Sequence, residues 1–241
     1  MLKKLDRKLE YCIIFSDLFQ LFFKHNPERI IKDLDLIISH LIKNKKTIIL
    51  PTFNLNFPKT KKTGFSEKYI QTGFLNKYLV KKYKFLRTSR PMYNYGVIGP
   101  KSKKIINLKQ STAWGKDSVI GFLTKNKALG IGLNIDKKIF NWLVIHHCEE
   151  MNYVPYRYFK ILKGKNVDLK KIVEEKMYVR NLKLNFVEDG RLINKKLIKK
   201  KYLTNFKFHK INITLLNLFK YYIEANSLLI KNKYSLVKNE K

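Results

Sequence analysis

The sequence predicts an α/β fold, a single domain whose mixed, partly parallel sheet is flanked by helices. Short apolar runs alternate along the chain with longer segments whose apolar residues recur at helical spacing. The chain has 241 residues, of which 45% are hydrophobic and 13% aromatic, so it can bury a sizeable core. No internal repeat and no long linker divides it, so we expect one domain over residues 1–241.

The first half of the chain contains the clearest elements. Residues 11–15 are continuously apolar and predict a buried strand followed by a short helix. Pro27 opens a helix over 28–43, and a second buried strand over 47–50 ends at Pro51. The further elements expected are a loop over 51–68, a helix over 73–83, a loop over 87–91, a strand over 93–98, a loop entering a short helix over 115–125 and a strand over 128–133.

The second half predicts fewer strands. A helix over 140–151 carries the most polar chemistry of the chain. The remaining elements expected are a strand over 177–186, a turn at 189–190, a helix over 192–201 and a final helix over 214–230.

The N-terminal apolar stretch resembles a signal peptide only in outline. Ser16, Asp17 and Gln20 interrupt it, no small-residue cleavage site follows, and it is too short and polar to span a bilayer. Cys12 and Cys148 are too few for a disulfide framework. We therefore expect a cytoplasmic protein without a membrane partner.

The formal net charge of +33 would suit a polyanionic partner. However, the lysines are spread along the whole chain, and no helix-turn-helix, zinc-finger or RNP-like pattern accompanies them. Nucleic-acid binding is therefore an alternative hypothesis and not the main one. Lysine suffices where a surface only needs charge, whereas arginine is preferred where a planar donor must meet a carboxylate or phosphate. Four of the seven arginines stand out on this ground: Arg87, Arg90, Arg157 and Arg180.

The segment around His146 is the main candidate for catalysis. Positions i and i+3 of a helix are neighbours, so His146 can meet Glu149, and a carboxylate makes a histidine a better base. His147 and Glu150 have the same spacing and are an alternative pair. A metal half-site and a purely structural ion pair also remain open, although no second ligand cluster is found. A nucleophilic role for Cys148 is a weaker alternative to its being a small core residue.

The stretch His146–Lys160, HHCEEMNYVPYRYFK, resembles the signature of the aminoglycoside 3-N-acetyltransferase family. Four other segments resemble family motifs in the same order: Ile49–Phe53, Thr72–Leu79 with the following loop Arg87–Pro91, Trp114–Ser118, and Met177–Leu184. The resemblance covers about residues 11–230, nearly the whole chain.

This resemblance implies transfer of an acetyl group from acetyl-CoA to an amino-sugar nitrogen without a metal, the reaction by which such enzymes confer aminoglycoside resistance. It implies that His146 is the general base and Glu149 its partner. It also implies that Arg87, Thr88 and Ser118 line the active cleft.

Departures from the family pattern concern the substrate side of the site. Arg90 stands where many relatives have histidine, and Asn94 where they have serine. Leu143 and Val144 replace a frequent hydroxyl near the catalytic histidine. Because aminoglycosides are polycations and this chain is strongly basic, we expect an amino-sugar acceptor, including nucleotide-linked ones, with Arg90 as a fixed charge facing the substrate.

Two further alternatives are weighed against this interpretation. The segment Lys127–Gly132 nearly fits the pyrophosphate loop of the GNAT acetyltransferases, but it lies within an apolar run that reads as a strand. An inactive member of the family that serves as an interaction protein would also fit the lost hydroxyls.

Overall fold

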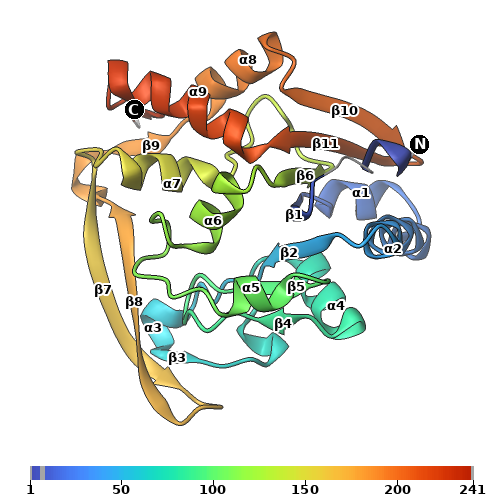
Figure 1. Cartoon of the computed structure of the whole chain (residues 1–241), viewed down its shortest axis with the longest axis horizontal. Coiled ribbons are helices and arrows are strands. Elements are labelled where there is room, and N and C mark those ends of the chain that lie inside the picture. Colours follow the sequence, from blue (N-terminus) through green and yellow to red (C-terminus); the bar gives the residue numbers. More distant parts are fainter. Residues whose placement is uncertain (1, 6–8, 240–241) are drawn as a thin grey trace.

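The computed structural model describes residues 2–5 and 9–239. Its main sheet has seven strands in the order β10-β11-β6-β1-β2-β5-β4. The central strands β6, β1 and β2 are parallel, and β11, β10, β5 and β4 are added antiparallel. The expected mixed, partly parallel sheet flanked by helices is confirmed (Figure 1). The strand bounds are β1 Tyr11–Ser16, β2 Thr47–Pro51, β4 Leu86–Arg87, β5 Tyr95–Ile98, β6 Leu129–Leu133, β10 Leu203–Phe208 and β11 Ile211–Asn217.

The helices form two layers, one on each face of the sheet. Alternate residues of β1 explain both layers, because Ile13 joins one buried cluster and Ile14 the other. One cluster includes side chains of α2 and α4, and the other includes side chains of α5 to α9. The helix bounds are α1 Phe19–Lys24, α2 Pro27–Lys43, α3 Phe57–Thr60, α4 Phe74–Tyr83, α5 Ser102–Ile106, α6 Val119–Lys125, α7 Val144–Met151, α8 Arg191–Lys199 and α9 Leu218–Lys231, with short 3₁₀ turns at Leu2–Leu5, Glu67–Tyr69 and Leu182–Leu184.

A long antiparallel hairpin, β7 (Arg157–Asn166) and β8 (Lys171–Arg180), leaves the body of the molecule at its lower left (Figure 1). The two-residue strand β3 (Lys62–Thr63) pairs in parallel with the far part of β7. A second small sheet pairs β9 (Phe186–Glu188) with β12 (Val237–Asn239). The base of the hairpin and the end of β9 bring charged residues to the end of α7, where the candidate site lies.

Several boundaries differ from the sequence prediction. The expected helix over 214–230 begins only at Leu218, because residues 214–217 complete β11 and Asn217 caps the helix by accepting from the backbone N–H of Phe219 at 3.0 Å. The expected strand over 177–186 is interrupted, since β8 ends at Arg180 and a 3₁₀ turn follows. Helix α7 begins at Val144 and not at residue 140.

Among the described residues, no helix is long and apolar enough to cross a membrane.

The other helix predictions in the first half are confirmed within a residue or two. Helix α2 shows why, because Asn26 caps it by accepting from the backbone N–H of Glu28 at 2.9 Å, and Pro27 occupies its first turn.

Candidate active site

Helix α7 presents His146 at the edge of a surface pocket while burying most of its other side chains. His146 keeps 18% of its side chain exposed, whereas Glu149, one turn later, is completely buried. Nδ1 of His146 lies 3.2 Å from Oε2 of Glu149. The pairing predicted from the i, i+3 spacing is therefore present in the structure.

Glu149 is held by more than the histidine. The Tyr156 hydroxyl donates to Oε1 of Glu149 at 3.0 Å, and Nε of Arg157 lies 2.9 Å from Oε2. Burial raises the pKa of Tyr156, and the Glu149 charge raises it further, so this hydroxyl stays a donor. A buried carboxylate with three partners is fixed in position beside the imidazole.

A second carboxylate, Glu188 at the end of β9, completes the cluster. Its Oε1 lies 2.5 Å from Nη2 of Arg157 and 3.6 Å from Nδ1 of His146. Nη2 of Arg157 is also 3.2 Å from Nδ1 of His146. Burial alone would raise the pKa of Glu188, but the charge and hydrogen bond of Arg157 lower it, and so does the charge of Arg180. Glu188 is therefore a carboxylate in this site.

Arg157 occupies the middle of this cluster. Burial would lower its pKa, but the charges of Glu149 and Glu188 outweigh that effect and raise it. His146, Glu149 and Glu188 place ligand atoms within 4.8 Å of one another, close enough to hold a metal ion. The guanidinium already supplies a positive charge to all three groups, so the cluster is organised around an arginine.

The sequence pointed to Arg157 by its residue type but did not find Glu188. Glu188 ends a three-residue strand that begins at Phe186, where the expected strand over 177–186 stops, and no spacing links it to α7. Only the folded chain brings it to His146.

The alternative pair, His147 and Glu150, separates in the structure. Nδ1 of His147 faces the Trp114 carbonyl oxygen at 2.6 Å, and burial lowers the His147 pKa, so the ring is a neutral donor. Glu150 accepts from the Thr112 hydroxyl at 2.5 Å. Cys148 is fully buried, and burial raises the pKa of its thiol well above the usual value. These three residues support the helix and do not face the pocket.

Two neighbouring pockets meet beside His146. The first, called here the polar pocket, is lined by Phe53, Tyr93, Trp114, Leu143, His146, Arg157, Tyr178, Val179, Arg180 and Glu188. The second, called here the apolar pocket, is lined by Ile14, Phe15, Ser16, Pro51, Phe53, Thr72, Asn76, Phe140, Asn141 and Leu143. Phe53 and Leu143 belong to both, so they stand at the boundary between the pockets.

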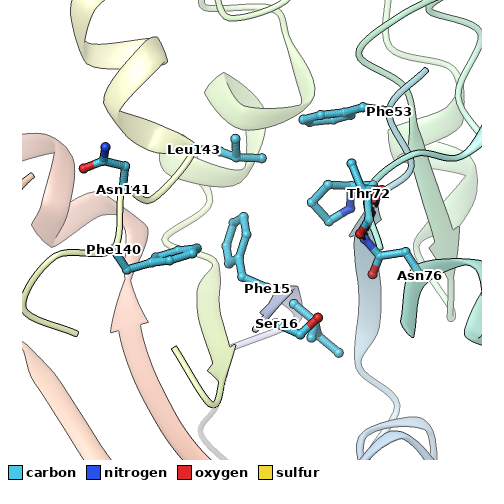
Figure 2. A pocket seen from close by; sticks show the side chains of 10 residues that line it. Phe15, Ser16, Phe53, Thr72, Asn76, Phe140, Asn141 and Leu143 are labelled. Atoms are coloured by element: carbon cyan, nitrogen blue, oxygen red, sulfur yellow. Dashed lines mark hydrogen bonds between the residues drawn. The ribbon is translucent and has the colours of Figure 1, made fainter. Parts of the chain in front are cut away.

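Figure 2 shows the apolar pocket at the ends of β1 and β2. Phe15 and Phe140 lie on one side of it, and Thr72 and Asn76 on the other. The Asn76 side-chain amide donates to the Pro51 carbonyl oxygen at 2.7 Å. None of the described residues that line the pocket is charged, and the pocket lies where open α/β sheets bind ligands, beyond the carboxyl ends of parallel strands.

Arg87 and Thr88 lie behind the site and line neither pocket. Arg87 is buried and donates to the side-chain oxygen of Asn94, to the Thr52 carbonyl at 2.9 Å and to carbonyls of the loop 64–66. Burial lowers its pKa to about 10. The Thr88 hydroxyl accepts from the backbone N–H of Tyr95 at 2.8 Å. Both residues tie together the strands that carry the pocket.

Arg90 and Ser118 are also internal. Arg90 forms a buried ion pair with Glu175, whose other oxygen accepts from the backbone N–H of Tyr93 at 3.3 Å. Arg90 therefore does not point its charge into the polar pocket and lines a separate surface hollow. Ser118 caps α6, accepting from the backbone N–H of Gly121 at 3.0 Å and donating to the Gly115 carbonyl at 2.7 Å. Through these bonds both residues support the aromatic wall made by Tyr93 and Trp114.

The near-GNAT segment is part of the core. Gly130 and Gly132 lie in the fully buried strand β6, and a Cβ on Gly130 would come within 2.8 Å of the Trp142 ring. These glycines allow tight packing under Trp142 and do not form a phosphate loop.

Comparison with solved structures tests the expected fold. YokD from Bacillus subtilis shares 15% identity, with 95% of this chain and 91% of that chain covered and a TM-score of 0.70. Aminoglycoside acetyltransferase AAC(3)-IVa shares 13% identity over 97% of this chain and 88% of that chain, with a TM-score of 0.71. The chain has the aminoglycoside 3-N-acetyltransferase fold. AAC-VIa, solved with bound sisomicin, has a similar structure at 10% identity, with 95% of this chain and 94% of that chain covered and a TM-score of 0.70.

The aminoglycoside 3-N-acetyltransferase fold that the motifs predicted is therefore confirmed across nearly the whole chain. No family model and no curated protein matches the sequence itself. At 10 to 15% identity the likeness establishes the fold, and a shared fold alone does not establish an activity.

Proposed function

We propose that the protein transfers an acetyl group from acetyl-CoA to an amine of an amino sugar or aminoglycoside, with His146 as general base. The observation that carries this proposal is the orientation of His146. Its Nδ1 faces the carboxylate of Glu149, and its Nε2 has no hydrogen-bond partner among the described residues. The tautomer that donates from Nδ1 to Glu149 leaves Nε2 as an acceptor at the polar pocket.

In this mechanism the acceptor enters the polar pocket as an ammonium ion. Nε2 of His146 takes its proton, and the resulting imidazolium is stabilised by Glu149. The free amine then attacks the thioester carbonyl, an amide bond forms, and the C–S bond breaks. The proton on His146 goes to the departing thiolate, and the attacking nitrogen loses its second proton to solvent as the amide forms, so that one proton is released overall.

We propose that acetyl-CoA lies with its pantetheine arm in the apolar pocket and its thioester at Phe53 and Leu143. The lining is apolar with a few amide and hydroxyl groups, which matches an aliphatic chain carrying two amides. Coenzyme A is polyanionic, and the net charge of +33 would accelerate its encounter with the protein. A location in the cytoplasm is consistent with the two buried, free cysteines.

We propose that Arg157, and not a metal ion, holds Glu149 and Glu188 in place around His146. Arg87, Thr88, Arg90 and Ser118 contribute indirectly, because their hydrogen bonds fix the strands and turns that carry Tyr93 and Trp114.

The experiment that tests the proposed function is acceptor-dependent release of coenzyme A, followed with a thiol reagent. The acceptors would include aminoglycosides, simple amino sugars and sugar nucleotides with a free amine. Release with any of them, with the acetylated product identified by mass, supports the proposal. An absence of both release and coenzyme A binding would contradict it. Salt-dependent binding to any DNA duplex would then favour the nucleic-acid alternative.

A further inference from the structure

We infer that the acceptor is an amino sugar carrying an anionic group, a phosphate or a carboxylate, and that Arg180 binds this group. The inference rests on the proposed function, because it names the substrate class of the same site. It depends on which charged side chains of the polar pocket already have partners.

The polar pocket has little capacity for a polycation. Among the residues that the structure describes, Glu188 is the only carboxylate in its lining, and it is already paired with Arg157 at 2.5 Å. Glu149, behind it, is completely buried and has its own partners. AAC-VIa and AAC(3)-IVa were solved with sisomicin, gentamicin or apramycin, which carry several ammonium groups. No carboxylate in this lining is left unpaired to bind such groups.

Unlike Glu188, Arg180 has no ion-pair partner among the described residues. It is the last residue of β8, faces Arg157 across the hairpin and lines the polar pocket with a half-buried side chain. Among residues 2–5 and 9–239, its guanidinium has no hydrogen bond and no ion pair within 4 Å, and its charge acts on Glu188 only at longer range. Arg157, the other arginine of the lining, already forms ion pairs with Glu149 and Glu188. Arg180 is thus a planar donor available to an incoming carboxylate or phosphate.

Arg180 and His146 line the same pocket as a set of aromatic rings. Tyr93 and Trp114 have their ring centroids 4.6 Å apart, and Trp114 lies 4.9 Å from the His146 ring. Aromatic faces suit the apolar C–H surface of a sugar ring. The geometry therefore fits a sugar that rests on this wall, directs its amine to His146 and offers its anionic group to Arg180.

The fixed charge that the sequence prediction placed on Arg90 is thus supplied by another residue. Arg90 is neutralised within the core by Glu175, a residue of β8. Arg180, the last residue of β8, lines the polar pocket.

Calorimetric binding at physiological salt tests the inference without requiring turnover. The probes are glucosamine, glucosamine 1-phosphate, UDP-glucosamine, muramic acid and gentamicin, so that a sugar phosphate, a nucleotide and a carboxylate are distinguished. At least one anionic probe should bind about tenfold or more tightly than glucosamine. Arg180→Ala should remove this preference, and Arg180→Lys should retain part of it.

Lys163→Ala is the matched control, because it removes one positive charge from the same hairpin at a side chain that is 72% exposed. It should leave the preference unchanged. The inference is overturned if gentamicin binds more tightly than every anionic probe, if no anionic probe binds, or if Arg180→Ala keeps the preference. An anionic preference together with an absence of both coenzyme A release and coenzyme A binding would contradict the proposed reaction and would support only the binding of an anion by Arg180.

Discussion

Arg157 and Glu188 form an ion pair at the edge of the polar pocket, with Nη2 of Arg157 2.5 Å from Oε1 of Glu188. The same guanidinium reaches the buried Glu149 through Nε at 2.9 Å. One arginine therefore neutralises two carboxylates beside the proposed base, and its removal should affect both stability and catalysis.

Arg157→Met should lower the free energy of unfolding by about 3–5 kcal/mol, because it leaves Glu149 as an uncompensated buried charge. Arg157→Lys should lower it less, since the charge remains while the planar pairing is lost. Urea denaturation followed by circular dichroism measures both. The double variant Arg157→Met/Glu188→Gln should lose less free energy of unfolding than the sum of the losses in the two single variants. Additive effects would show that the pair is not coupled.

His147 should make the stability dependent on pH below neutrality. Burial lowers its pKa in the folded state below the ordinary 6.5, so the unfolded chain binds the proton more readily. The contribution of His147 to the free energy of unfolding is fully present above pH 6.5. It is lost as the pH falls toward the pKa that His147 has in the folded state. His147→Gln, which can still donate to the Trp114 carbonyl, should lose less stability between pH 7 and 5. Equal losses in the two proteins would contradict the assignment of His147 as a buried neutral donor.

The variant Ser118→Ala should show whether Ser118 supports the fold or contacts a substrate, because the first role affects stability and the second affects KM. The variant loses the cap of α6 and should be less stable by about 0.5–2 kcal/mol. Because Ser118 is fully buried and lines neither pocket, the folded variant should keep its KM for both substrates within about twofold. A large rise in KM with unchanged stability would place Ser118 in the cleft, as the family resemblance implied.

The two cysteines should be unreactive in the native protein. Both are buried, and burial raises the pKa of Cys12 to about 12 and that of Cys148 well above its usual value. The reactive thiolate is therefore scarce and inaccessible at pH 8. A thiol reagent should label neither residue before denaturation and both after it. Fast labelling of Cys148 in the native state would revive its candidacy as a nucleophile.

The sequence predicted best what depends on local spacing. The apolar periodicity and cap of α2, the buried run of β1 and the i, i+3 relation of His146 to Glu149 are all present as expected. The β7–β8 hairpin was not predicted, because its lysine-rich strands lack a buried face along most of their length. Thr214 was assigned to a helix because the apolar residues at the end of β11 are followed by those of α9 with only Asn217 between them.

Non-local charge pairing could not be predicted. Arg90 was expected to face the substrate because nothing in the sequence indicates that Glu175, 85 residues away, neutralises it. Glu188 was missed for the same reason. Arg180 and Arg157 were singled out by residue type, but only the fold shows that one is engaged and the other available to a ligand.

The most direct test of the central claim compares His146→Ala with the wild type, using kcat for the best acceptor and the Kd of coenzyme A together. His25→Ala, at a half-buried histidine outside both pockets, is the control. If His146 is the general base, kcat should fall by roughly 10²- to 10⁴-fold in His146→Ala while the Kd stays within about twofold and the control is unaffected. A His146→Ala variant that retains wild-type kcat would contradict the account.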